Sequence, residues 1–112
     1  MVIRLSIIKL MLNLCLYSIK TLANDEYLYV VNYYGQLTKR KVLELKHRFA
    51  QIILDNTQAF FQKPLDGIDT IYSCRKFFGV PDGAYLSTNK RLSEELEIDI
   101  SRERMALSLI HI

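Results

Sequence analysis

Four polar side chains of different chemistry follow two apolar runs of the chain. Asp55 and Gln58 belong to the sequence Asp-Asn-Thr-Gln, which closes the first run. Ser73 and Lys76 belong to Ser-Cys-Arg-Lys, which closes the second. A carboxylate, an amide, a hydroxyl and an amine brought together in this way could bind an organic cofactor and polarise it.

The amine of Lys76 indicates which cofactor chemistry to expect. A lysine amine can hold the aldehyde of pyridoxal 5'-phosphate as a Schiff base and later move the α-proton of an amino-acid substrate. A carboxylate keeps the pyridine nitrogen protonated, a hydroxyl suits the phosphate, and an amide suits the phenolic oxygen. The residue types therefore predict Lys76 and Asp55 as catalytic residues, and Asp55, Gln58, Ser73 and Lys76 as cofactor contacts, with no metal site.

Three strand-like segments would bring these groups together. Tyr27–Val31, Ile52–Leu54 and Ile68–Tyr72 are short and rich in β-branched and aromatic residues. Each is followed by a polar turn, the first of them at Asn32–Gly35. Because open α/β sheets bind ligands at the carboxyl ends of their strands, the three turns are expected to meet at one site.

A helix is predicted between the first two of these strands. It should begin near Thr38, and Val42, Leu45 and Phe49 recur at the spacing of a buried helical stripe. The charges between them are expected to form a solvated face. Strand, helix and strand would make a βαβ unit with parallel strands and a right-handed crossover.

The second half of the chain continues the α/β pattern. Gly79–Gly83 is typical of a turn and Ala84–Leu86 of a short strand, so Lys76 should lie on a compact connection between two strands. A further helix is predicted over Lys90–Leu96. The expected fold class is α/β with a mainly parallel sheet.

The same residues resemble a known family. The segments Val31–Gln36, Ile53–Ala59 and Tyr72–Gly79 are similar to the large domain of fold-type I pyridoxal phosphate enzymes, and most similar to the DegT-type aminotransferases. In that group a D-x-x-[QH] motif contacts the pyridine nitrogen and the phenolic oxygen, and a serine shortly before the Schiff-base lysine contacts the phosphate. The resemblance gives these roles to Asp55, Gln58, Ser73 and Lys76, and implies a partial three-layer sandwich.

The family resemblance implies a function. The chain would be part of an aminotransferase that moves an amino group from an amino-acid donor to a keto acceptor through the Lys76 Schiff base, and many DegT-type enzymes act on nucleotide-linked keto sugars. Such enzymes are mostly cytoplasmic homodimers. The S-x-x-K spacing is shorter than usual for sugar enzymes and closer to the cysteine desulfurase group, although Arg75 stands where that group has His. A desulfurase or lyase, and a small non-catalytic α/β module, therefore remain alternatives.

The composition and charge of the chain argue against two classes of function, nucleic-acid binding and membrane insertion. A net charge of +3 is too small to indicate nucleic-acid binding, and the uncharged run Leu10–Ile19 is too short to span a membrane. Cys15 and Cys74 have no metal-like spacing, and Cys74 is interpreted as a packing residue. His47 is expected on the surface of the helix.

The two ends of the chain are expected to lie outside the cofactor-binding domain. Residues 1–22 have no clear period and could be a false start or a leader, whereas 23–106 would be the partial large domain. Residues 107–112, Leu-Ser-Leu-Ile-His-Ile, match the translation of a common sequencing adapter. A chain of 112 residues is also short for an enzyme of this superfamily, so a fragment, inactive by itself, is predicted.

Overall fold

The computed structural model describes residues 4–8 and 21–91 of the chain. In this part the elements are β1 (Arg4–Ile8), β2 (Glu26–Val31), the 3₁₀ turn η2 (Tyr33–Gly35), α1 (Lys39–Arg48), β3 (Ile52–Asp55), β4 (Asp69–Ser73) and β5 (Ala84–Ser87). The segment 107–112 and all but the first two residues of the helix predicted over 90–96 lie outside the described residues. Lys90 and Arg91 are not helical.

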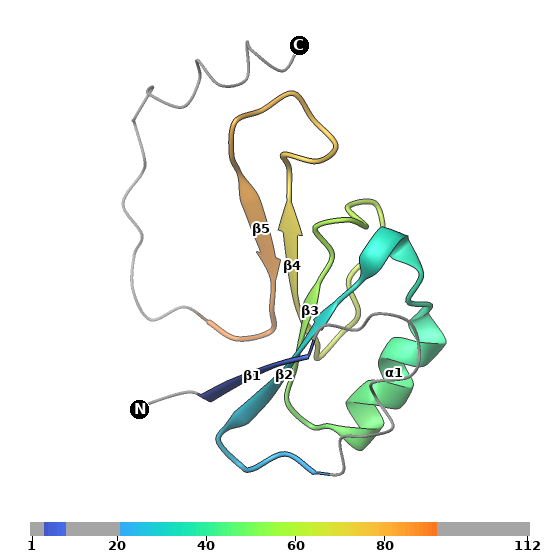
Figure 1. Cartoon of the computed structure of the whole chain (residues 1–112), viewed down its shortest axis with the longest axis vertical. Helices are drawn as coiled ribbons and strands as arrows, with labels where there is room; N and C mark the ends of the chain where they lie inside the picture. Colours follow the sequence, from blue (N-terminus) through green and yellow to red (C-terminus); the bar gives the residue numbers. More distant parts are fainter. Residues whose placement is uncertain (1–3, 9–20, 92–112) are drawn as a thin grey trace.

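The strands form one sheet in the order β1-β2-β3-β4-β5 (Figure 1). The first four are parallel to one another, and β5 runs antiparallel to β4. In the register, Val31 on β2 lies beside Asp55 on β3, and Asp55 lies beside Ile71 on β4. The protein is thus a small α/β domain with a mostly parallel sheet, as the sequence predicts.

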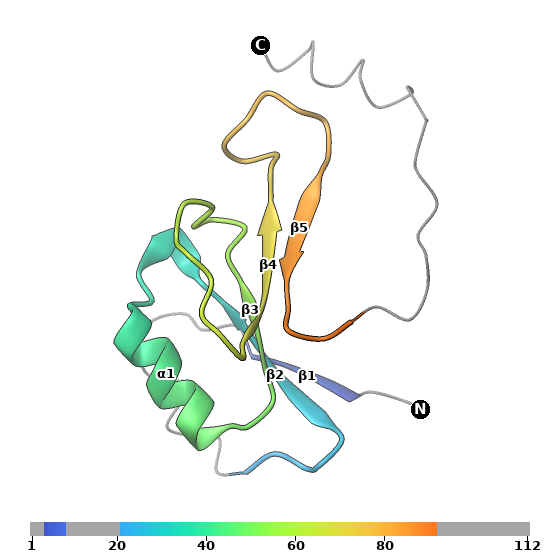
Figure 2. The same ribbon diagram turned by 180° about the vertical axis from the view of Figure 1, so that it is seen from behind.

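Helix α1 packs against one face of the sheet, which Figures 1 and 2 show from opposite sides. Thr38 caps its first turn, because its hydroxyl accepts a hydrogen bond from the Lys41 amide at 3.3 Å. Val42 and Leu45 are buried, and so is Phe49 just beyond the last turn. The predicted helix and its apolar stripe are confirmed, and His47 lies on its exposed side.

The hydrophobic core lies between α1 and the sheet. Alternate residues of β2, β3 and β4 face it, because successive side chains of a strand point to opposite faces. Leu28 and Val30 of β2 and Ile52 and Leu54 of β3 are the strand residues of this cluster. The odd-numbered residues of β2, β3 and β4, among them Asp55, point to the other face and are half-buried.

Two features of the sheet differ from the sequence prediction. The strand β1 lies within residues 1–22, for which no element was predicted, and it pairs in parallel with β2. Asp55 and Ser73 are the last residues of β3 and β4, although they were expected just past the strands. Because they belong to strands, the alternation of the sheet sets the direction of their side chains.

Candidate functional site

The carboxyl ends of β2, β3 and β4 lie at the same edge of the sheet, since the three strands are parallel (Figures 1 and 2). The turn that contains η2 follows β2, the segment 56–68 follows β3, and the loop 74–83 follows β4. The predicted convergence of three strand ends is therefore present.

Asp55 is held by two neighbours at the end of β3. The Tyr29 hydroxyl donates to its Oδ2 at 2.7 Å. The Thr57 backbone amide donates to Oδ1 at 2.8 Å, and the Thr57 hydroxyl donates to the same oxygen. This second pair is a side-chain turn of the kind that aspartate makes with the residue two positions on, so Asp55 both ends the strand and orients the segment that follows.

The environment of Tyr29 keeps its phenol protonated. Burial, the hydrogen bond to Asp55 and the negative charge of that carboxylate together raise the pKa of Tyr29 from 10.0 to about 12. The hydroxyl therefore remains a hydrogen-bond donor at neutral pH. Tyr29 had no role in the sequence prediction, although its odd position on β2 puts it on the same face as Asp55.

Ser73 ends β4 on the same face of the sheet as Asp55. The register pairs Asp55 with Ile71, and Ser73 follows two positions later. Its hydroxyl makes no hydrogen bond to another described residue. The two residues therefore share one face and one edge of the sheet, on neighbouring strands.

Lys76 lies in the turn that begins directly after β4. The Phe77 and Phe78 amides donate to the Cys74 carbonyl at 3.1 and 3.0 Å, and the Cys74 amide donates to the Gly83 carbonyl at 2.9 Å. These bonds make the compact connection predicted for Lys76. Its amine is exposed and has no hydrogen bond or ion pair with another described residue. Cys74 is a half-buried free thiol packed beside Gly83, in line with a packing role.

Gln58 binds the turn after β2. Its Oε1 accepts a hydrogen bond from the Tyr34 backbone amide at 3.2 Å. Because that partner can only donate, the carboxamide oxygen is identified and the two N–H donors of Gln58 point elsewhere. Tyr34 itself has a left-handed backbone with φ of 54°, a conformation that costs a non-glycine residue about 1 kcal/mol or more.

A buried amide network joins the first two turns beneath these groups. Asn32, at the end of β2, donates through Nδ2 to Asn56 Oδ1 at 3.0 Å and to Gln62 Oε1, and its Oδ1 accepts from the Leu37 amide at 3.0 Å. Asn32 and Asn56 are both buried. The Tyr72 hydroxyl of β4 donates to the Gln62 carbonyl at 2.8 Å. The network thereby ties three strand ends together on the α1 side.

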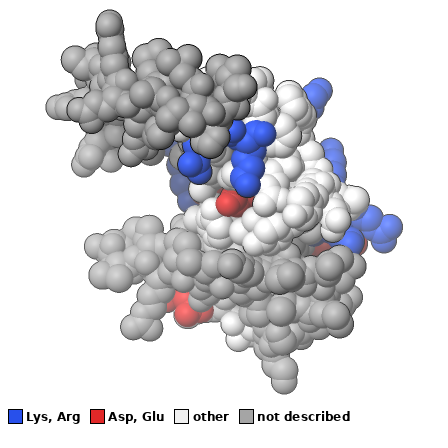
Figure 3. All heavy atoms as spheres, turned by 45° about the horizontal axis from the view of Figure 1, so that its top comes forward, with Lys and Arg blue, Asp and Glu red and all other residues white. Residues whose placement is uncertain are grey.

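An aromatic cluster joins the segment after β3 to the loop that carries Lys76. The Phe60 ring lies 5.0 Å from the Phe78 ring and 6.0 Å from the Phe77 ring between centroids, and it packs edge-on against Tyr72. The whole cluster comprises Phe60, Phe61, Tyr72, Phe77, Phe78 and Tyr85. Figure 3 turns the upper end of Figure 1 toward the reader and shows a broad area without charged side chains, with Lys, Arg and acidic side chains at its border.

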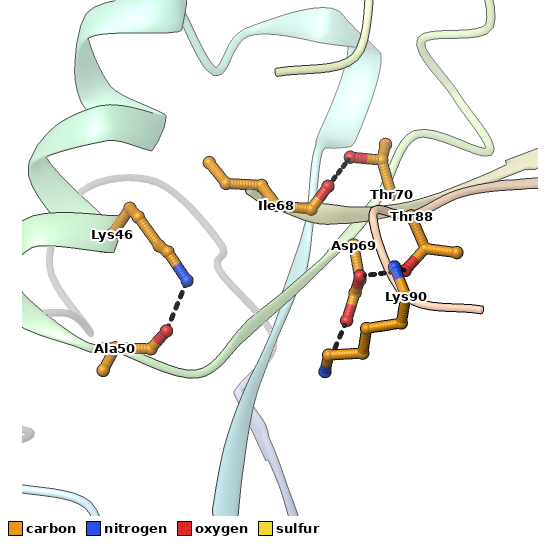
Figure 4. A network of polar contacts seen from close by, with 7 residues as sticks. All are labelled: Lys46, Ala50, Ile68, Asp69, Thr70, Thr88 and Lys90. Carbon is orange, nitrogen blue, oxygen red and sulfur yellow. Dashed lines mark hydrogen bonds and ion pairs between the residues drawn. The ribbon is translucent and has the colours of Figure 1, made fainter. Parts of the chain in front are cut away.

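A second polar group lies at the opposite end of β4. Asp69, the first residue of that strand, accepts from the Thr88 hydroxyl at 2.6 Å and from the Lys90 amine at 3.2 Å (Figure 4). The Thr88 hydrogen bond lowers the pKa of Asp69, with Lys90 adding to it and partial burial opposing it. These contacts tie the end of β5 to the start of β4, away from the candidate site.

Other features of the described residues do not join this site. A shallow hollow over α1 is lined by Lys39, Arg40, Leu43, Glu44 and His47, all on the helix. In residues 4–8 and 21–91 no three His, Cys, Asp or Glu side chains lie together as metal ligands would. None of the helices described is long and apolar enough to cross a membrane.

The structure thus brings the four predicted residues to one edge of the sheet in two pairs. Asp55 and Gln58 lie at the end of β3, and Ser73 and Lys76 lie at the end of β4. No hydrogen bond or ion pair joins any two of the four. The sequence prediction missed the residues that hold them, and the alternation of β2 is the signal that could have identified Tyr29.

Comparison with known proteins does not assign the chain to a family. No protein-family model matches it, and searches of curated proteins and of solved structures found no match.

Proposed function

We propose that the chain is part of the large domain of a DegT-like, pyridoxal phosphate-dependent aminotransferase. The observation that carries this proposal is that Asp55 and Ser73 lie on one face of the sheet, at the carboxyl ends of adjacent parallel strands, with Lys76 in the turn after Ser73. Ligands of open α/β sheets bind at such ends. The proposed enzyme would have the fold of a three-layer sandwich, of which the described sheet and α1 are two layers, and it would work as a cytoplasmic homodimer.

The donors and acceptors at this edge fit pyridoxal 5'-phosphate. Asp55 offers a carboxylate to the ring N–H, and Gln58 has free N–H donors because its oxygen is already bound to Tyr34. The Ser73 hydroxyl and the Lys76 amine have no described partner, so neither must break a bond to reach a ligand. The donor set therefore matches the cofactor's ring nitrogen, phenolic oxygen, phosphate and aldehyde.

Each residue has a distinct task in the proposed reaction. When bound, the cofactor supplies an electron sink for the carbanion formed at the substrate's α-carbon. Lys76 would hold the cofactor through its amine and, once released by the amino donor, carry the α-proton. Asp55 would keep the ring nitrogen protonated. Gln58 would donate to the phenolic oxygen and Ser73 to the phosphate.

Reductive trapping tests the proposal directly. The protein is mixed with a limiting amount of pyridoxal 5'-phosphate, reduced with borohydride, and digested for peptide mass spectrometry. We expect the phosphopyridoxyl group mainly on Lys76. The variant Lys76→Ala should lose it, and the control Lys63→Ala, which removes another exposed lysine, should retain it.

An even distribution of the label over the exposed lysines would overturn the proposal. That result would favour a small non-catalytic α/β module, in which Asp55 serves only the turn with Thr57 that the structure contains. A desulfurase or lyase of the same superfamily would also trap the cofactor on Lys76. Product analysis of the complete enzyme separates these activities, because a desulfurase releases sulfur from cysteine and an aminotransferase forms a new amino compound.

A further inference from the structure

Tyr29 is the one described side chain that holds Asp55 from a neighbouring strand. Its hydroxyl reaches Asp55 Oδ2 at 2.7 Å, across the parallel pairing of β2 with β3. The two residues lie on the face of the sheet opposite α1. Phenylalanine at this position would keep the ring and lose only the hydrogen bond.

The three hydrogen bonds to the Asp55 carboxylate are distributed unevenly between its two oxygens. Oδ1 accepts from both the amide and the hydroxyl of Thr57, whereas Oδ2 accepts from Tyr29 alone. A carboxylate has about four acceptor sites, two on each oxygen. One site therefore remains, and it lies on Oδ2, next to the Tyr29 hydroxyl.

We propose that Tyr29 is a positioning residue for Asp55, which fixes the carboxylate so that Oδ2 faces the ring N–H of the cofactor. This inference rests on the proposed function. With Oδ1 held by Thr57 and Oδ2 by Tyr29, the carboxylate cannot rotate, and the free site on Oδ2 has a set direction. Loss of the Tyr29 hydroxyl frees that end of the carboxylate, so the bond to the ring nitrogen weakens while the other cofactor contacts remain.

A pair of ligands tests this role. The first is pyridoxal 5'-phosphate, and the second is its deaza analogue, in which a CH group replaces the ring nitrogen and cannot donate to Asp55. Affinity for each is measured by titrating the ligand and trapping it on Lys76 with borohydride. Tyr29→Phe is compared with the wild-type chain and with Tyr27→Phe, a matched change two residues earlier on the same face of β2.

We expect Tyr29→Phe to weaken binding of pyridoxal 5'-phosphate about tenfold, the usual effect of one lost hydrogen bond to a charged group. Its affinity for the deaza analogue should equal that of the wild-type chain, and Tyr27→Phe should change neither. Damage to the fold alone would lower both affinities equally, and that outcome overturns the positioning role.

The outcomes also separate this inference from the proposed function. Selective trapping on Lys76 that Tyr29→Phe leaves unchanged for both ligands would refute the role of Tyr29 and leave the function standing. An absence of selective trapping in the wild-type chain would refute both.

Discussion

Truncation of Asn32 to alanine should destabilise the protein at the edge of the sheet that carries the candidate site. The side chain is fully buried and makes three hydrogen bonds, to Asn56, to Gln62 and from the Leu37 amide. Its side chain bonds Leu37 in the segment after β2, and Asn56 and Gln62 in the segment after β3. Its loss therefore acts on two of the three turns at once.

The expected magnitude follows from these partners. Asn56 is buried, so its Oδ1 would remain without a partner, at about 1–3 kcal/mol. Gln62 and Leu37 are half-buried and can bind water in part, so each lost bond costs about 0.5–1.5 kcal/mol. The free energy of unfolding should fall by about 2–6 kcal/mol, a large part of the roughly 5–15 kcal/mol of a typical domain.

Urea unfolding followed by far-ultraviolet circular dichroism measures this loss. The control is Asn24→Ala, which removes the same side chain from an exposed turn and should change the stability by less than about 0.5 kcal/mol. Asn32→Asp is a second, near-isosteric test. It keeps the acceptor for Leu37 and puts a carboxylate against two amide oxygens, so it should destabilise the protein as well. A loss below about 1 kcal/mol in Asn32→Ala would refute the assignment of a stabilising network.

Three further changes test the rest of the structure. Folding raises the pKa of Tyr29 from 10.0 to about 12, so the hydrogen bond of its phenol stabilises the protein fully below pH 10 and is lost between pH 10 and 12. In urea unfolding measured at a series of pH values, Tyr29→Phe should not show this loss of stability between pH 10 and 12. The pKa of Asp69 is lowered by Thr88 and Lys90, so its contribution is present above pH 3.8 and disappears as the pH falls through the folded value. Asp69→Asn should abolish this loss of stability at low pH. If the stability of the variant falls with decreasing pH in the same way as that of the wild-type chain, the assignment is contradicted. Phe60→Ala should cost about 2 kcal/mol and raise the rate of proteolysis in the loop 74–83, because this ring joins that loop to the segment after β3; equal proteolysis of both proteins would argue against this function of the cluster.

Much of the fold could be predicted from local sequence patterns. The stripe of Val42, Leu45 and Phe49 has the period of a helix that packs on a sheet, and Thr38 is a residue type that caps such a helix. The short apolar runs before Asp55 and Ser73 have the composition of buried parallel strands. These signals depend on neighbouring residues along the chain, so they can be recognised without knowledge of the tertiary structure.

The strand β1 and its pairing could not be predicted in the same way. The segment 1–22 is apolar without a clear period, and a strand there is defined by the hydrogen bonds that it makes with β2. The exact ends of β3 and β4 were also missed by one residue. That difference matters, because it places Asp55 and Ser73 within the strands and so on a definite face.

The sequence by itself determined which chemical groups stand at the strand ends: a carboxylate, an amide, a hydroxyl and an amine, at Asp55, Gln58, Ser73 and Lys76. Tertiary structure alone decided what holds them. Tyr29 lies on another strand from Asp55, and Asn32 reaches Gln62 across two turns, so their contacts arise only when the parallel sheet forms. Residue type is a local property of the chain, whereas a hydrogen bond between distant residues depends on the register and twist of the whole sheet.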